Sequence, residues 1–229
     1  MREIVLDTET TGFDPVNGDR IVEIGCIELE NHLATGQIHH VYINPERDMP
    51  EAAFRVHGLS EEMLRDKPVF AEIANAFLEF IADSPLVIHN ASFDIGFLNA
   101  ELERTGNPPI PMSRAIDTLD MARKKHPFGP NSLDALCRRY GIDNSARQLH
   151  GALLDCELLA EVYLELIGGR QPGLTLEHNN SPAVPKQTKR TRKNLKRTTP
   201  LPIRLDKNEI EAHQKLVTSL GENALWKSC

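Results

Sequence analysis

The chain has few cysteines, and none is spaced as a zinc ligand would be. Its 229 residues include four, Cys26, Cys137, Cys156 and Cys229, and no CxxC pair. We therefore expect reduced thiols, some of them buried as small apolar side chains. The sequence also lacks an apolar run of transmembrane length, and its first ten residues, MREIVLDTET, carry acids where a signal peptide would be apolar. These absences predict a soluble, cytoplasmic protein that makes no membrane contact.

Basic residues are scarce in most of the chain and concentrated near its end. Residues 1–180 hold 15 Lys/Arg and 29 Asp/Glu, a net charge of −14, whereas residues 181–229 hold 11 and 4, a net charge of +7. An acidic body with a basic tail argues against a protein that simply coats DNA. If the body meets nucleic acid, we expect a local site where metal ions offset the acids.

Apolar periodicity predicts consecutive strands first and alternating strands and helices afterwards. Ser60 and Ser92 are candidate N-cap residues for two of the helices. This order favours an α/β fold in which helices pack on a mixed sheet. Strands are expected at 2–7, 21–30, 37–45 and 85–91, with a hairpin link at 31–36, and helices at 60–67, 68–84, 92–106, 131–142 and 151–169, with a strand that turns helical at 114–125.

Three segments are predicted: a globular domain at 1–169, a linker at 170–205 and a terminal segment at 206–229. The linker has little apolar periodicity and contains KQTKRTRKNLKR, seven bases without an acid, which is typical of a flexible chain. In the terminal segment, Asp206 and Glu209 suit an N-terminal cap pairing. That helix has no body of its own to pack on, so it predicts a partner protein. Its apolar stripe is Ile210, Leu216, Val217 and Leu220.

The stretch IVLDTETTG at 4–12 places two carboxylates at the end of an apolar strand. Asp7 and Glu9 share one face with Val5 and lie about 7 Å apart along the strand. Such a pair either lies in water at an exposed strand end or holds a divalent cation, for which oxygen ligands favour Mg²⁺ or Mn²⁺. This stretch alone leaves both interpretations open.

Two further stretches add acids to the candidate site. LVIHNASFD at 86–94 ends at Asp94, early in a predicted helix, and HGALLD places Asp155 five residues after His150. On a helix Asp155 aligns with apolar residues at i+3, i+4 and i+7, so it is either a satisfied edge residue or a carboxylate that points inward at a metal. On the same helix His150 would project from a different face than Asp155. We therefore expect it in the preceding loop, exposed and mobile.

In this order and these contexts, the acids and the histidine resemble the pattern of the DEDDh 3′–5′ exonucleases. DTETTG, HNASFD and the H-x4-D spacing carry the resemblance over residues 4–167. VHGL at 56–59, NSLDALCRRYGIDNS at 131–145, LHGALLD at 149–155 and the tail around Trp226 are similar to the epsilon proofreading subunits of bacterial DNA polymerase III. The resemblance implies a ribonuclease-H-like fold and the removal of mispaired 3′-terminal nucleotides as 5′-mononucleotides.

The resemblance also implies a two-metal-ion hydrolysis of the phosphodiester bond. Two Mg²⁺ or Mn²⁺ ions about 4 Å apart would stabilise the attacking and leaving oxygens. Asp7 would bridge both ions, and Asp94 would help to hold the second. Glu9 and Asp155 would complete the site of the ion that activates water. His150 would be the general base, because the pKa of imidazole lies near neutrality.

Contacts to the terminal nucleotide are implied as well. Thr10 and His57 would lie beside it, and Phe93 would either stack on the terminal bases or pack in the core. Together with Asp7 and Glu9 they form the implied substrate-binding set.

One position departs from the family pattern. Family members carry a Glu five residues before the His of VHGL, but here that position is Ala52, and Glu51 stands one residue away. A contact from a Glu to the sugar is therefore in doubt.

The segment after the body implies further partners. QPGLTL at 171–176 resembles a sliding-clamp-binding motif with anchors Gln171, Leu174 and Leu176, and its alternative is ordinary linker. The terminal segment resembles the part of the epsilon subunits that binds the catalytic alpha subunit, and a small theta-like accessory subunit is a further implied partner. The basic run either tethers the segments or touches DNA phosphates transiently.

Two other functions stay open. The chain could be a stand-alone DEDDh exonuclease that acts on RNA or DNA 3′ ends, although such an enzyme has no need of a capped amphipathic helix on a basic tether. It could also be a scaffold that bridges clamp and polymerase without catalysis, against which the intact acids and histidine argue.

Overall fold

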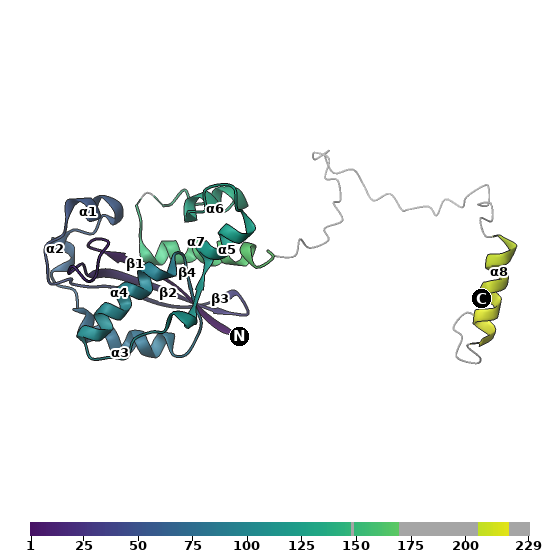
Figure 1. Ribbon diagram of the computed structural model, residues 1–229, viewed down its shortest axis with the longest axis horizontal. Helices are drawn as coiled ribbons and strands as arrows, with labels where there is room; N and C mark the ends of the chain where they lie inside the picture. The colour runs from purple at the N-terminus through teal and green to yellow at the C-terminus, as the bar shows by residue number, and fades with distance from the viewer. Residues whose placement is uncertain (148, 170–205, 220–229) are drawn as a thin grey trace, which may run out of the picture. The chain divides into compact units, whose positions relative to one another are not determined.

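The computed structural model describes residues 1–147, 149–169 and 206–219. Its centre is a five-stranded sheet in the order β3-β2-β1-β4-β5 (Figure 1). β1 pairs antiparallel with β2 but parallel with β4, and β4 pairs parallel with β5. The C-terminal ends of these three parallel strands therefore meet at one edge of the sheet. The strands are β1 Arg2–Thr10, β2 Ile21–Glu30, β3 Leu33–Tyr42, β4 Leu86–Ile88 and β5 Ala115–Asp117.

Helices cover both faces of the sheet and bury two separate apolar cores. Ile4 and Leu6 of β1 belong to the core with α3 and α4, whereas Val5 between them belongs to the core with α5, α6 and α7. This period of two confirms the mixed α/β fold expected from the sequence. The helices are α1 Glu51–His57, α2 Glu61–Leu64, α3 Phe70–Ile81, α4 Ala91–Arg104, α5 Thr118–Lys125, α6 Leu133–Tyr140, α7 Ala152–Leu166 and α8 Lys207–Ser219, with a 3-10 turn at Met112–Arg114.

Several strand boundaries differ from the predicted ones, and β4 is shorter than the strand expected at 85–91. β1 continues to Thr10, because antiparallel pairing with β2 extends to Thr10↔Ile21. β3 begins at Leu33 instead of residue 37. The hairpin link is a two-residue turn, since Asn31 and His32 both adopt positive φ (50° and 67°), and the chain pairs again at once.

The helix caps show where local sequence misleads. Ser60 is an N-cap as predicted, and its hydroxyl accepts a hydrogen bond from the Met63 amide at 3.2 Å. Ser92 is not a cap, so that prediction is wrong. α4 begins one residue earlier, and its first free amides, on Asn90 and Ala91, donate to the carboxylate of Asp117 at 3.2 and 3.0 Å. Asp117 of the neighbouring strand β5 therefore caps this helix, in place of the local serine that the sequence indicated.

The loop between β1 and β2 is fixed against α4 by a buried ion pair. Arg20 donates to both carboxylate oxygens of Glu101, at 2.6 and 3.0 Å, and the Glu101 side chain is 1% exposed. Such a bidentate pair fixes direction as well as distance. It keeps Phe13 at the loop tip near Phe93, with 6.4 Å between the ring centroids.

Helix α8 begins with a capped turn and exposes apolar side chains within its own segment. Its first turn is capped as predicted, since the Glu209 amide donates to Asp206 at 2.8 Å and the Asp206 amide donates back to the Glu209 carboxylate at 3.0 Å. Ile210 and Leu216 of its stripe are exposed within this segment, and Leu220 lies outside the described residues.

Two predictions from composition concern the state of the cysteines and the absence of a membrane-spanning helix. The described cysteines, Cys26, Cys137 and Cys156, are buried free thiols as expected, and Cys229 lies outside the described residues. Within residues 1–147, 149–169 and 206–219, none of the helices has the length and apolar character required to cross a bilayer.

Candidate active site

The carboxylates of β1 lie on the face of the sheet that α7 covers. Asp7 stands opposite Gly25 of β2 and Glu9 opposite Glu23. Val5, two residues before Asp7, belongs to the core beneath α7, so the three side chains share a face as predicted. Glu9 is 7% exposed and Asp7 is half-buried. These acids do not lie in open water.

Asp155 reaches the same place because α7 begins in contact with β2. A Cβ at Gly25 would stand 2.5 Å from the backbone carbonyl of Ala152, so only glycine allows the helix to approach this closely. The thiol of Cys156 donates to the Gly25 carbonyl at 3.2 Å. Asp155 is 4% exposed and therefore buried at this end of the helix, and its role as a metal ligand stays a prediction.

Asp94 joins the acids from the opposite side of the sheet. It lies in the first turn of α4 and is 3% exposed. Its Oδ1 accepts two hydrogen bonds from Thr8, from the amide at 3.1 Å and from the hydroxyl at 2.7 Å. Because Thr8 lies between Asp7 and Glu9, these bonds hold Asp94 at the same end of β1.

Too little positive charge surrounds Asp7, Glu9 and Asp94 for all three carboxyls to be ionised at the same time. Burial raises the pKa of Asp7 well above its usual range, and the neighbouring acids add to the shift. Burial also raises the pKa of Glu9 to about 8 and that of Asp94 to about 7. A cation placed among them would reverse this, since a nearby positive charge favours the ionised form.

Arg147 is a part of the site that the sequence analysis did not predict. Its side chain is 7% exposed, and its Nη2 donates to Asp155 at 2.6 Å while its Nη1 donates to Asp134 at 2.9 Å. The hydrogen bond to Asp155 raises the pKa of Arg147 further. Nη2 also lies 2.9 Å from Nδ1 of His150. An arginine three residues before a histidine forms no recognisable pattern, so nothing in the sequence pointed to it.

His150 lies in the loop before α7 and is exposed, as expected. Its side chain is 48% exposed, and its Nδ1 is 3.6 Å from the Asp155 carboxylate. The backbone amide of His150 donates to the Val56 carbonyl at 3.0 Å, which ties this loop to α1. Burial and the nearby Arg147 lower the pKa of His150. The imidazole is therefore neutral at pH 7 and able to accept a proton.

The residues gathered here suit a divalent cation. One ligand atom from each of Glu9, His150 and Asp155 lies within 4.8 Å of the others. Asp7 and Asp94 adjoin this group, and oxygen-rich sets of this kind favour hard divalent cations. Burial and then the nearby charge of Asp155 raise the pKa of Glu9, and a bound cation would oppose both effects by favouring the ionised carboxylate.

A first cavity, of about 810 Å³, opens on these acids. His57 is buried, its Nδ1 accepts from the Leu59 amide at 3.0 Å, and its Nε2 has no hydrogen-bond partner among the described residues. Phe93 packs on Phe97 with 4.9 Å between the ring centroids and also lines the cavity, so its stacking on a terminal base stays a prediction. The cavity contains every substrate-binding residue predicted from the sequence: Asp7, Glu9, Thr10, His57 and Phe93.

The departure at residues 51 and 52 has a structural consequence. Ala52 lines the first cavity, whereas Glu51 does not, and its carboxylate instead pairs with Arg55 on the exposed side of α1. A contact from Glu51 to a bound nucleotide is therefore not available in this arrangement.

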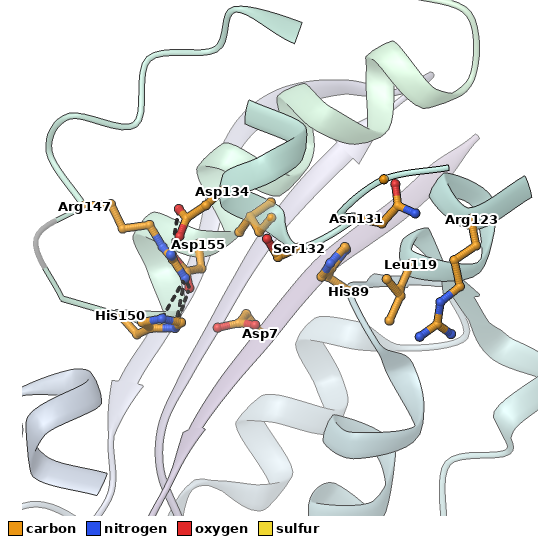
Figure 2. Close-up of a pocket in the computed structure, with 12 residues that line it drawn as sticks. Asp7, His89, Leu119, Arg123, Asn131, Ser132, Asp134, Arg147, His150 and Asp155 are labelled. Carbon is orange, nitrogen blue, oxygen red and sulfur yellow. Dashed lines mark hydrogen bonds and ion pairs between the residues drawn. The ribbon is translucent and has the colours of Figure 1, made fainter. Parts of the chain in front are cut away.

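A second cavity, of about 720 Å³, adjoins the first. Asp7, His150 and Asp155 line both cavities, so the acid cluster is the point where they meet. Figure 2 shows the second cavity extending from His150 and Asp7, past His89, to Arg123. The residues predicted to bind a clamp, Gln171, Leu174 and Leu176, lie outside the described residues.

The chain is similar to a known protein family and to named bacterial proteins over most of its length. Residues 4–163 match the family described as "Exonuclease". The chain is 50% identical over 227 residues to the DNA polymerase III subunit epsilon of Rickettsia conorii, covering 98% of each chain. It is 51% identical over 176 residues to the subunit of that name from Escherichia coli K12, covering 74% of this chain and 72% of the relative.

Solved structures share the fold. A structure of exonuclease I is similar with a TM-score of 0.65 and 19% identity, covering 75% of this chain and 41% of that chain. Exonuclease X in complex with 5′ overhanging duplex DNA is similar with a TM-score of 0.55 and 26% identity, covering 72% of this chain and 90% of that chain.

Proposed function

The chain belongs to the exonuclease family and, within it, to the DNA polymerase III epsilon subunits, and on this premise we propose how its residues carry out the reaction. It is a 3′–5′ proofreading exonuclease that acts within a bacterial DNA polymerase III. One observation carries the residue-level proposal: four acids from three separate elements converge with a neutral imidazole where a cavity opens.

The acids are the proposed ligands of two divalent cations, Mg²⁺ or Mn²⁺. Bound there, the cations would stabilise charge on the attacking and leaving oxygens of the phosphodiester and lower the pKa of the attacking water. Asp7 lies centrally and would serve both cations, and Asp94 would serve one of them. Glu9 and Asp155, which lie near His150, would serve the other.

His150 is the proposed general base. Its lowered pKa keeps it neutral at pH 7, and its exposed position lets it reach a water above the acids. Arg147 and the Val56 carbonyl restrict how far its loop can move. We assign Arg147 the role of a positioning residue, because it contacts both the base and a ligand acid.

The first cavity is the proposed site of the terminal nucleotide. Its volume suits a small ligand. Phe93 offers a face for base stacking, and the unpartnered Nε2 of His57 offers a polar contact. Thr10 lies in the wall between these groups and the acids. Hydrolysis at the acids would then release a 5′-mononucleotide.

The proposed partners follow from the same premise. The substrate is a DNA 3′ end, and the catalytic alpha subunit would bind the segment that contains α8, whose apolar side chains are exposed within that segment. Binding of the sliding clamp at 171–176 and of a theta-like subunit are further proposals. We also propose the bacterial cytoplasm as the location, since that is where the chromosome is replicated.

A stand-alone nuclease is the second candidate. The whole-chain match to epsilon subunits favours the replicative role, because it includes the linker and the terminal segment. A chain ended after Gly169 should lose its binding to the alpha subunit in a pull-down. Intact binding would overturn the assignment of the terminal segment.

The nuclease proposal is tested by nucleotide release from paired and mispaired DNA 3′ ends with Mg²⁺ or with EDTA. We expect faster release from mispaired ends, no release in EDTA, and a loss of at least about 10³-fold in Asp7→Ala with the circular dichroism spectrum unchanged. Glu51→Ala is the matched control and should stay within about twofold, because Glu51 faces away from the cavity. Full activity in Asp7→Ala would refute the ligand assignment.

A further inference from the structure

The second cavity has no role in the chemistry described so far, although it shares four lining residues with the first, Asp7, His89, His150 and Asp155. Asp7, His150 and Asp155 stand at the boundary of the two cavities. If the terminal nucleotide occupies the first cavity, the scissile phosphate lies at these residues. The rest of the strand must then leave on the other side, where the second cavity begins (Figure 2). This step rests on the proposed function.

A basic stretch of an otherwise acidic body forms part of the lining of the second cavity, together with the carboxylates of Asp7, Asp134 and Asp155. Residues 118–140, which form α5, α6 and the loop between them, hold five Lys/Arg and two Asp/Glu, a net charge of +3, whereas residues 1–180 carry −14. Local positive charge of this kind is what a phosphate backbone requires. Arg123 lines the cavity, and its surface pair with Asp120 at 3.5 Å is weak enough for a phosphate to replace.

An exposed aromatic side chain is the sequence neighbour of a residue that lines the second cavity. Phe128 is 97% exposed and immediately precedes Gly129, which lines the cavity. An aromatic ring left in water gains nothing from folding, since its apolar surface remains hydrated. Its faces are open to stacking, and stacking on nucleic acid bases is favourable for all four bases.

The loop that carries Phe128 is fixed at both ends. The Asn131 amide group donates to the His126 carbonyl at 3.1 Å, and Arg139 donates to the Pro130 carbonyl at 3.0 Å. The ring of His126 also contacts the Tyr140 hydroxyl at 2.6 Å. The ring of Phe128 is therefore presented by a braced loop, which lowers the entropy cost of binding.

We propose that the second cavity and Phe128 form an upstream-strand site, which binds the nucleotides immediately 5′ of the scissile phosphate in a single-stranded 3′ end. Arg123 binds a phosphate of that stretch, and Phe128 stacks on one of its bases. These two contacts would hold the strand on a body that is otherwise acidic.

The test compares substrates that do and do not reach the upstream-strand site, using the full chain. The p-nitrophenyl ester of thymidine 5′-monophosphate offers only a terminal nucleotide, whereas oligothymidylates of two to ten nucleotides extend beyond it. In Phe128→Ala and Arg123→Gln, we expect KM for the ten-nucleotide substrate to rise about tenfold, the effect of losing one stack or one phosphate contact. Ester hydrolysis should stay within about twofold, which also shows that the variants fold.

Two matched controls isolate the site. Val16→Ala removes another exposed apolar side chain that lines neither cavity, and Lys124→Gln removes the neighbouring charge of α5, which lines neither. Neither control variant should show the tenfold rise in KM for the ten-nucleotide substrate. An oligonucleotide KM in Phe128→Ala and Arg123→Gln within twofold of the unchanged chain at every length would overturn the upstream-strand site, and would leave Phe128 as a contact for a partner protein.

A binding measurement separates this proposal from the proposed function. Fluorescence anisotropy of a labelled ten-nucleotide strand, with Ca²⁺ in place of Mg²⁺, reports binding without requiring cleavage. A strand that binds the unchanged chain about tenfold more tightly than Phe128→Ala supports the site even if no nucleotide is released. Equal affinities overturn it even if the chain proves to be an active exonuclease.

Discussion

Two parts of the acid cluster differ in how their charge is balanced. Asp155, at the start of α7, is held by a buried guanidinium from Arg147. Among the described residues, no arginine or lysine forms an ion pair with Asp7 or Glu9 of β1, and burial raises the pKa of both carboxyls. The difference shows that the site is only partly neutralised by its own protein groups. The unbalanced part is where a cation would contribute most.

The comparison also assigns different origins to the two parts. The acids of β1 are placed by the strand itself, through alternation on one face. Asp155 is placed by a close approach between α7 and β2 that Gly25 permits. A change in packing should therefore displace Asp155 in particular. Removing a carboxylate should lower the free energy of unfolding at Asp155 and raise it at Asp7.

Among the changes that separate the two parts, the largest effect is expected from breaking the close approach of α7 to β2. Gly25→Ala would set a Cβ 2.5 Å from the Ala152 carbonyl, so the helix must shift and Asp155 with it. We expect nuclease activity to fall about 100-fold, since misplacement by about 1 Å can cost that much. Gly96→Ala is the control, because a Cβ there meets nothing within 4 Å. Equal activities in these two variants would contradict the role of Gly25.

The next effect distinguishes the two parts by stability. In EDTA, Asp155→Asn leaves Arg147 buried with only Asp134 to balance it, and we expect a loss of about 2 kcal/mol in the free energy of unfolding. Asp7→Asn should raise the free energy of unfolding instead, because folding at pH 8 must either bury the Asp7 charge or protonate its carboxyl, and Asn requires neither. Urea unfolding at pH 8 measures both. If both variants change the free energy of unfolding in the same direction, the two acids do not differ in how their charge is balanced.

A pH dependence follows from Glu9. Burial raises its pKa from 4.5 to about 8 in the folded chain, so the folded state binds more protons than the unfolded state between these values. The contribution of Glu9 to stability is therefore lost as pH rises from about 4.5 to 8. In EDTA, Glu9→Gln should be more stable than the unchanged chain at pH 8, with a difference that shrinks toward pH 5. A difference independent of pH would show that burial does not control this carboxyl.

The smallest effect is expected at the outer partner of Arg147. Asp134 is 40% exposed, so its pair with Arg147 is screened by water. Asp134→Asn should lower the free energy of unfolding in EDTA by less than about 1 kcal/mol. A loss as large as that of Asp155→Asn would mean that Asp134, and not Asp155, provides the main balance for the guanidinium.

Sequence patterns located most of the candidate site but not its supports. Asp7, Glu9, Asp94, His150 and Asp155 were identified from local stretches, and the structure brings them around one cavity. Their supports come from residues distant in sequence or without a pattern. Arg147 pairs across a loop, Thr8 reaches Asp94 across 86 residues, and the cap of α4 comes from β5. Such pairs leave no local periodicity, so one sequence does not reveal them.

By itself, the sequence determined the order of strands and helices and the residues that carry charge at their ends, because alternation and helical spacing are local properties of the chain. Only the tertiary structure decided which of those charges meet, which one is balanced by Arg147, and where the second cavity opens. These outcomes depend on distances between segments far apart in the chain, and those distances are set by how the helices pack on the sheet.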